Sequence, residues 1–106
     1  LGDRSLVINL KPGVRVSTLH PGLLLGLMVL DGIYAQSGYL LVVTSITDGT
    51  HMDGSLHYKG QAVDIRTRDI ATPVLNLIVK NIKESLGADY DVVLERDHLH
   101  LEYDPK

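Results

Sequence analysis

The chain has 106 residues, a formal net charge of −3 with neutral histidines, and no cysteine. Its length suits one domain, and its 44% hydrophobic and 22% charged residues are typical of a folded one, which argues against disorder. Scattered basic residues and an acidic balance argue against nucleic-acid binding. The absence of cysteine excludes a disulfide scaffold and a thiolate zinc site, so any metal site must use histidine and carboxylate ligands. No membrane-spanning helix or signal peptide is predicted, because the most apolar stretch, residues 23–30, is too short.

The first half of the chain predicts a short strand, a buried helix and an interior strand. Residues 5–10 are rich in Leu, Val and Ile, which indicates a strand or an extended arm. Residues 23–36 carry hydrophobic side chains mostly three and four positions apart, the pattern of a buried helix, and Gly38 is a plausible stop. His20 precedes that helix and is interpreted as structural. Residues 40–46 are apolar on both faces and predict a central strand.

A polar loop separates this strand from a second helix. Residues 47–60 hold three glycines, two aspartates and two histidines, the composition of a functional loop. Residues 62–66 predict a short strand. A clear amphipathic stripe over residues 73–86 predicts a helix that ends at Gly87. Its candidate N-caps are Thr67, Asp69 and Thr72.

The chain ends in a predicted hairpin. Residues 91–95 and 98–103 are strands around a tight turn at residues 96–97. Together the elements predict a single α+β domain over residues 1–106, in which a small antiparallel sheet packs against two main helices.

Two clusters of polar residues suggest a metal site. His98 and His100 are two positions apart, so on a strand both imidazoles project from the same face. That pattern fits either metal ligands or two partly exposed surface histidines. His57 ends the polar loop and Asp64 lies on the next strand, and Gly60 lets the backbone turn between them. Two histidines and one aspartate with an open fourth position are the catalytic pattern of zinc, which would lower the pKa of its bound water to roughly 7.

A zinc hydrolase also needs a carboxylate that takes a proton from the water. Glu95 and Asp97 lie near the histidine pair, although strand parity alone would turn both away from it. The turn at residues 96–97 breaks that parity, which favours Asp97 and keeps Glu95 as the second choice. Each is otherwise a solvated turn carboxylate.

The motifs resemble a known family. The pattern Ser-x-His-x-x-Gly-x-Ala-x-Asp, followed by Asp-x-x-His with His-x-His, resembles the zinc D-Ala-D-Ala carboxypeptidases. The L-alanyl-D-glutamate endopeptidases and the zinc-bearing domain of hedgehog proteins share that fold group. The resemblance extends over residues 44–102. It rests on Ser55, His57, Gly60, Ala62, Asp64, Asp97, His98 and His100.

The resemblance implies a role for each matching residue. His57, Asp64 and His100 would bind one zinc ion per chain. Asp97 stands at the position of the family's catalytic carboxylate. His98 stands where a family histidine lines the site and contacts the substrate or the oxyanion.

Three further residues are candidate substrate-binding positions. Ser55 is a motif residue expected to hold the loop through hydrogen bonds to the ligands. His51 is similar to an upstream histidine of hedgehog-type proteins, or is an exposed loop residue. Many family members carry an arginine before the first motif, but residues 40–55 contain none. Arg66 shares the strand parity of Asp64, so it either faces the cleft and binds a substrate carboxylate or forms a structural salt bridge.

The function implied is a zinc peptidase, either a carboxypeptidase or an endopeptidase. It would hydrolyse peptidoglycan stem peptides through a zinc-activated water and so act on the bacterial cell wall. The first alternative is a catalytically inactive zinc-binding module of the same fold, acting in binding or as part of a phage particle. The second is a structural domain with fortuitous histidines.

Overall fold

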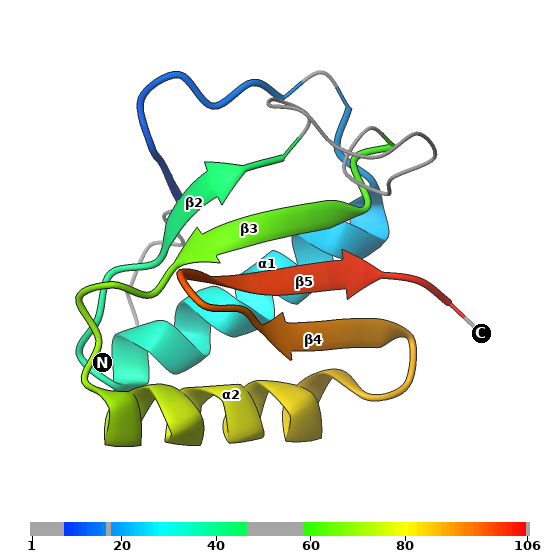
Figure 1. Ribbon diagram of the computed structural model, residues 1–106. Coiled ribbons are helices and arrows are strands. Elements are labelled where there is room, and N and C mark those ends of the chain that lie inside the picture. The colour runs from blue at the N-terminus through cyan, green and yellow to red at the C-terminus, as the bar shows by residue number, and fades with distance from the viewer. Residues whose placement is uncertain (1–7, 17, 47–58, 106) are drawn as a thin grey trace, which may run out of the picture.

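The computed structural model describes residues 8–16, 18–46 and 59–105, which form a five-stranded sheet and two helices (Figure 1). In chain order the elements are β1 (Asn9–Leu10), α1 (Pro21–Gln36), β2 (Val42–Ser45), β3 (Ala62–Arg66), α2 (Thr72–Leu86), β4 (Tyr90–Leu94) and β5 (His98–Tyr103). The predicted helices and hairpin are confirmed. The predicted strand at residues 5–10 is described only from residue 8, where β1 occupies its last two positions.

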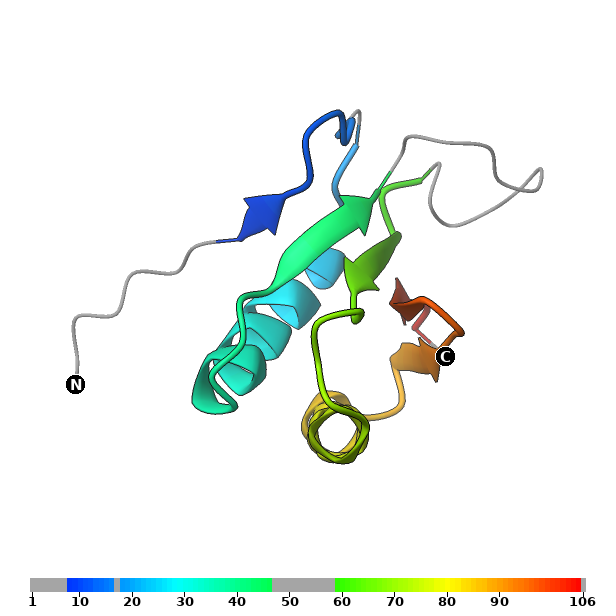
Figure 2. The ribbon, with the colours of Figure 1, turned by 60° about the vertical axis from the view of Figure 1, so that its left-hand side comes forward.

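The sheet has the strand order β1-β2-β3-β5-β4. Strands β2, β3, β5 and β4 pair antiparallel, and β1 is added parallel to β2 at the edge. Figures 1 and 2 show both helices on the same side of the sheet. The predicted α+β class is therefore confirmed, with the refinement that the edge strand β1 makes the sheet mixed. Strand β2 is an interior strand as expected, while β3 is the middle strand of the five.

The core lies between the sheet and the helices. Large, fully buried side chains recur along α1 and α2 at helical spacing and along β3 and β5 at every second residue, because strand side chains alternate between the two faces. These residues are Leu23, Leu27, Leu30 and Tyr34 of α1, Ile78 and Ile82 of α2, Val63 and Ile65 of β3, and Leu99 and Leu101 of β5. The alternation places the remaining residues of β3 and β5 on the opposite face of the sheet.

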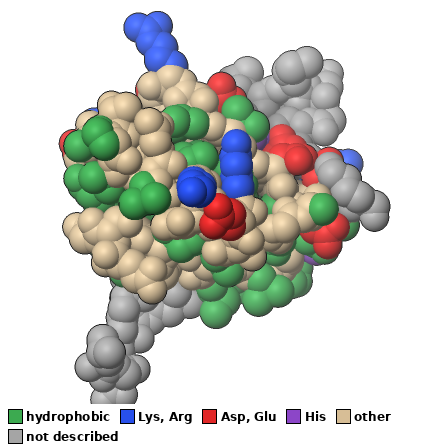
Figure 3. Space-filling view, turned by 90° about the horizontal axis from the view of Figure 1, so that it is seen from below, with side chains coloured by type: hydrophobic (Ala, Val, Ile, Leu, Met, Phe, Trp, Pro, Cys, Tyr) green, Lys and Arg blue, Asp and Glu red, His purple; other side chains and the backbone are tan. Residues whose placement is uncertain are grey.

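The outer surface of α2 carries its charged side chains. Lys80, Lys83 and Glu84 are exposed, whereas Ile78 and Ile82 are buried. Figure 3 views this side of the molecule and shows basic and acidic side chains close together, with hydrophobic side chains also exposed. None of the helices in the described parts of the chain is long and apolar enough to cross a membrane.

The start of α1 is fixed by a side-chain cap. His20 has extended backbone geometry, and its Nδ1 accepts a hydrogen bond from the backbone N–H of Gly22 at 2.9 Å. This bond satisfies one of the amide groups that the first helical turn leaves without a partner. The structural interpretation of His20 is therefore confirmed. After the C-cap residue Ser37, Gly38 adopts a φ of +84°, as expected for a residue that ends a helix.

The predicted N-caps of α2 are wrong. The N-cap is Ala71, whose side chain makes no capping bond, and Thr72 is already the first helical residue. Thr67 is buried and its carbonyl accepts the N–H of Ile70 at 3.0 Å in the turn before the helix. Pro73 explains why a polar cap is dispensable, because proline fixes a helical φ and has no N–H that needs a partner.

The entry to β3 is anchored to the segment before α1. Gly60 has a φ of +68°, and its carbonyl accepts the N–H of His20 at 2.9 Å. A Cβ atom at Gly60 would lie 2.2 Å from the carbonyl oxygen of Thr18. The predicted turn at Gly60 is confirmed, and the close approach explains why a side chain is excluded there.

Candidate metal centre

The pairing of β3 with β5 gathers the polar residues of the site on the sheet face that points away from the helices. Asp64 lies opposite His100, and Arg66 lies opposite His98. Directly opposed residues of antiparallel strands have Cβ atoms about 5 Å apart, so these four side chains are close neighbours. The face follows from the buried positions of Ile65 and Leu99, which turn their neighbours outward.

One carboxylate oxygen of Asp64 contacts both histidines. It lies 2.8 Å from Nδ1 of His100 and 3.5 Å from Nε2 of His98. The potential ligand atoms of the three residues lie within 4.8 Å of one another. Ligands of tetrahedral zinc at bond lengths of about 2.0 Å are about 3.3 Å apart, and the distances from Asp64 to the two histidines lie on either side of that value. The three residues could therefore hold a metal ion, and their donor types are ones that zinc accepts.

The second nitrogen of each ring is also held by a carboxylate. Nδ1 of His98 lies 2.7 Å from Oδ1 of Asp97, and Nε2 of His100 lies 2.8 Å from Oε1 of Glu102. The Asp97 side chain is 84% exposed, whereas that of Glu102 is 30% exposed. The sequence motifs assigned no role to Glu102, although its position two residues after His100 on the same strand places it on the same face.

These contacts shift the pKa of two groups. The hydrogen bond to Asp64 raises the pKa of His100 to about 9, against the opposing effect of burial and with help from Glu102. The hydrogen bond from His98 lowers the pKa of Asp97 below its usual value. At neutral pH the metal-free site therefore holds a protonated His100 beside Asp64, and a metal ion must displace that proton.

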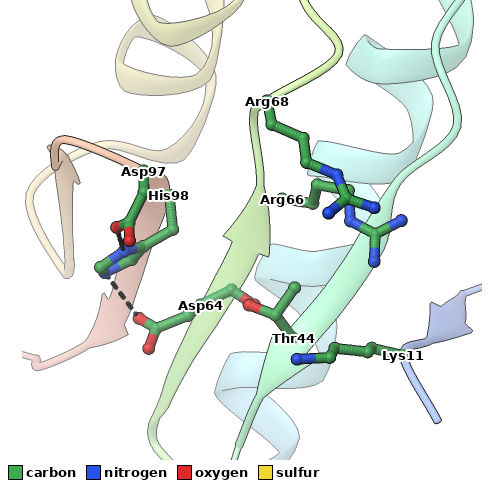
Figure 4. Close-up of a pocket in the computed structure, with 7 residues that line it drawn as sticks. All are labelled: Lys11, Thr44, Asp64, Arg66, Arg68, Asp97 and His98. Carbon is green, nitrogen blue, oxygen red and sulfur yellow. Dashed lines mark hydrogen bonds and ion pairs between the residues drawn. The ribbon is translucent and has the colours of Figure 1, made fainter.

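A cavity of about 420 Å³ opens beside Asp64 and His98. In Figure 4 the acidic and histidine side chains lie on one side of it and three basic side chains on the other. The full lining is Lys11, Thr44, Asp64, Arg66, Arg68, Asp97 and His98. Arg66 thus lines the cavity, which is the position that the proposed contact with a substrate carboxylate needs. Among residues 8–16, 18–46 and 59–105, no carboxylate forms an ion pair with it.

The structure brings together part of the set predicted from the sequence. Asp64, His98 and His100 form one cluster, and Asp97 lines the same cavity. Glu95 is exposed in the β4–β5 turn, where its backbone N–H donates to the His98 carbonyl at 2.9 Å, and it does not line the cavity. Three predicted residues lie outside the described part of the chain: His51, Ser55 and His57.

The comparison with known families agrees with this geometry. The model of the hedgehog amino-terminal signalling domain matches residues 35–102, more than half of the chain. The chain belongs to this family. The hedgehog-type domain has the hedgehog/DD-peptidase fold, so the fold group inferred from the motifs is confirmed. The matched segment includes β2 to β5 and therefore contains Asp64, Asp97, His98 and His100.

Proposed function

We propose that this hedgehog-type domain, residues 1–106, is a zinc peptidase that hydrolyses peptide bonds in bacterial peptidoglycan stem peptides. The observation that carries the proposal is the shared carboxylate oxygen of Asp64, which faces two imidazole nitrogens at the edge of a cavity. A zinc ion bound there would supply a Lewis acid and a water of lowered pKa. The cavity gives a substrate access to that side of the cluster.

Asp64 and His100 are the ligands with the strongest support, since their donor atoms are already 2.8 Å apart. The proposed third ligand is His57, on the grounds of the motif resemblance. The competing assignment uses His98, whose Nε2 lies 3.5 Å from the same oxygen. In the preferred assignment His98 remains beside the ligands and lines the cavity, and its proposed role is contact with the substrate or the oxyanion.

Asp97 is the proposed proton acceptor. Its pKa is lowered by His98, so it is ionised at neutral pH and able to accept a proton. It lines the cavity, whereas Glu95 does not, which supports the preference for Asp97. One oxygen of Asp97 contacts His98 at 2.7 Å, an arrangement that also orients that ring.

The basic side of the cavity suits a substrate with a carboxylate. Arg66 is the proposed contact, with Lys11 and Arg68 adding positive charge to the same wall. His51 and Ser55 remain proposed contributors on the motif resemblance. Peptidoglycan as the substrate also rests on that resemblance.

The family description favours a second candidate function. A hedgehog signalling domain suggests a zinc-binding module that acts through binding and performs no hydrolysis. This candidate shares the zinc ligands, so metal content alone does not distinguish it from a peptidase. The two differ in the need for Asp97.

The first test is elemental analysis of protein purified without chelator. About one zinc per chain is expected in the unmodified protein. His57→Ala is expected to lose it and His98→Ala to retain it, and the reverse result would make His98 the ligand. Absence of zinc even after it is added back would refute the peptidase proposal.

The second test is digestion of purified peptidoglycan. Asp97→Asn is expected to keep its zinc and to lose a factor of about 10² to 10⁴ in rate, the usual contribution of a general base. Glu95→Gln is the matched control and should retain activity. Full activity of Asp97→Asn would transfer the role to Glu95, and a zinc-loaded unmodified protein without activity would support the binding module.

A further inference from the structure

We propose that Glu102 is a positioning residue of the metal centre. Its carboxylate accepts a hydrogen bond from the N–H at Nε2 of His100, which leaves Nδ1 as the metal-binding atom. The inference rests on the proposed zinc site but adds a residue and an atom that neither the motifs nor the family description assign. Its basis is the pair of contacts at His100, with Asp64 at Nδ1 and Glu102 at Nε2, both at 2.8 Å.

The strand geometry gives Glu102 this position. It follows His100 by two residues on β5, so both side chains leave the same face. The residue opposite Glu102 on β3 is Ala62, whose methyl group offers no competing hydrogen bond. On the other side, Glu102 lies opposite Asp91 of β4, another acidic residue, which cannot neutralise it. Within the described part of the chain, the cationic group in contact with Glu102 is the His100 ring.

Burial makes this contact stronger than the similar one at His98. The side chains of His100 and Glu102 are 17% and 30% exposed, whereas Asp97 is 84% exposed to competing water. Partly buried charged hydrogen bonds are screened less by solvent and salt. Glu102 therefore constrains its ring more than Asp97 constrains His98.

The chemistry follows from the proton count of imidazole. A neutral ring carries one N–H, and a carboxylate can only accept a hydrogen bond. When zinc displaces one proton from the ring, Glu102 at Nε2 keeps the remaining proton on that nitrogen, and the Nδ1 lone pair is left for the metal position. Without Glu102, the remaining proton can stay on Nδ1 and donate to Asp64, which would occupy both ligands at once. Carboxylates behind ligating histidines commonly fix the tautomer in this way.

The experiment compares zinc affinity in three variants by competition with a chromophoric chelator. Glu102→Ala is expected to bind zinc about 10- to 100-fold more weakly, the usual effect of removing such a partner. Glu102→Gln has nearly the same shape and keeps an oxygen that can accept the Nε2 proton, so it should recover most of that loss. Asp104→Asn removes one negative charge near the end of the same strand and is the charge control, expected to change affinity by less than about threefold.

A second measurement identifies the ligand atom directly. In ¹⁵N NMR spectra of the zinc-loaded protein, His100 should show a proton on Nε2 and metal coordination at Nδ1. Coordination through Nε2, or unchanged zinc affinity in Glu102→Ala, would overturn the inference while the zinc site itself stands. An unmodified protein that binds no zinc would refute the proposed function as well, so the two failures are distinguishable.

Discussion

Replacing Gly60 by alanine should cost much more stability than the same replacement at Gly38. Both glycines have a positive φ, +68° and +84°, which an L-residue adopts at a cost of roughly 1–2 kcal/mol. Only Gly60 is also crowded. A Cβ atom there would lie 2.2 Å from the carbonyl oxygen of Thr18 and 2.8 Å from the backbone nitrogen of Leu19, whereas nothing lies within 4 Å at Gly38.

The crowding at Gly60 cannot be relieved by a side-chain rotation, because the atoms involved belong to the backbone. Overpacking of this kind costs about 1–3 kcal/mol. Separating the two segments would also weaken the bond from the His20 N–H to the Gly60 carbonyl, worth about 1 kcal/mol. We therefore expect Gly60→Ala to lower the free energy of unfolding by about 3–5 kcal/mol, and Gly38→Ala by about 1–2 kcal/mol.

Urea denaturation with linear extrapolation measures both values. The protein should be kept free of metal by a chelator, because zinc bound to the folded state would add its own stabilisation. If the two variants lose the same stability within about 0.5 kcal/mol, the close approach of Gly60 to Thr18 is refuted as a determinant of the fold.

Two further predictions concern buried groups. Among the described residues, the Tyr34 hydroxyl is a buried side-chain group without a hydrogen-bond partner, and burial raises its pKa to about 12. Tyr34→Phe should therefore leave the free energy of unfolding unchanged or raise it by up to about 2 kcal/mol. A clear loss of stability would reveal a partner of the hydroxyl. The pKa of His100 is raised from 6.5 to about 9, so the protonated ring stabilises the folded, metal-free protein. This stabilisation should be lost as the pH rises from 6.5 through 9, and urea denaturation at each pH measures the loss. Zinc affinity measured by chelator competition should rise over the same window, about tenfold per pH unit, and a flat profile would mean that zinc displaces no proton from His100.

The elements with strong periodicity were predictable because local physics dictates them. The stripe that buries Ile78 and Ile82 follows from the helical repeat, and it specified α2 to within one residue. The two-residue repeat also predicted that His98 and His100 share a face, a geometry that any strand imposes. These inferences needed no knowledge of which strands pair.

The contacts of the site were not predictable in the same way. The 2.8 Å contact between Asp64 and His100 depends on the register of β3 against β5, which are separated by α2 and β4 in the chain. A shift of one residue would turn one set of side chains to the opposite face. The motif resemblance supplied the association of Asp64 with His100, but it carried no information about Glu102. The prediction of the N-cap of α2 was wrong for a local reason, because the influence of Pro73 outweighed the general preference for polar caps.

The question of catalysis turns on what surrounds the ligands. A structural zinc site closes all four coordination positions, whereas a catalytic site leaves one for water or substrate. Within the described residues, one side of the Asp64–His98–His100 cluster is filled by Glu102, and the side toward Asp97 borders the 420 Å³ cavity. Glu102, the carboxylate proposed to orient a ligand, and Asp97, the carboxylate proposed to accept a proton, thus lie at opposite ends of the histidine pair. That division of roles is what hydrolysis requires, and it predicts that Glu102 variants fail through zinc affinity while Asp97 variants fail in the rate of the zinc-loaded protein.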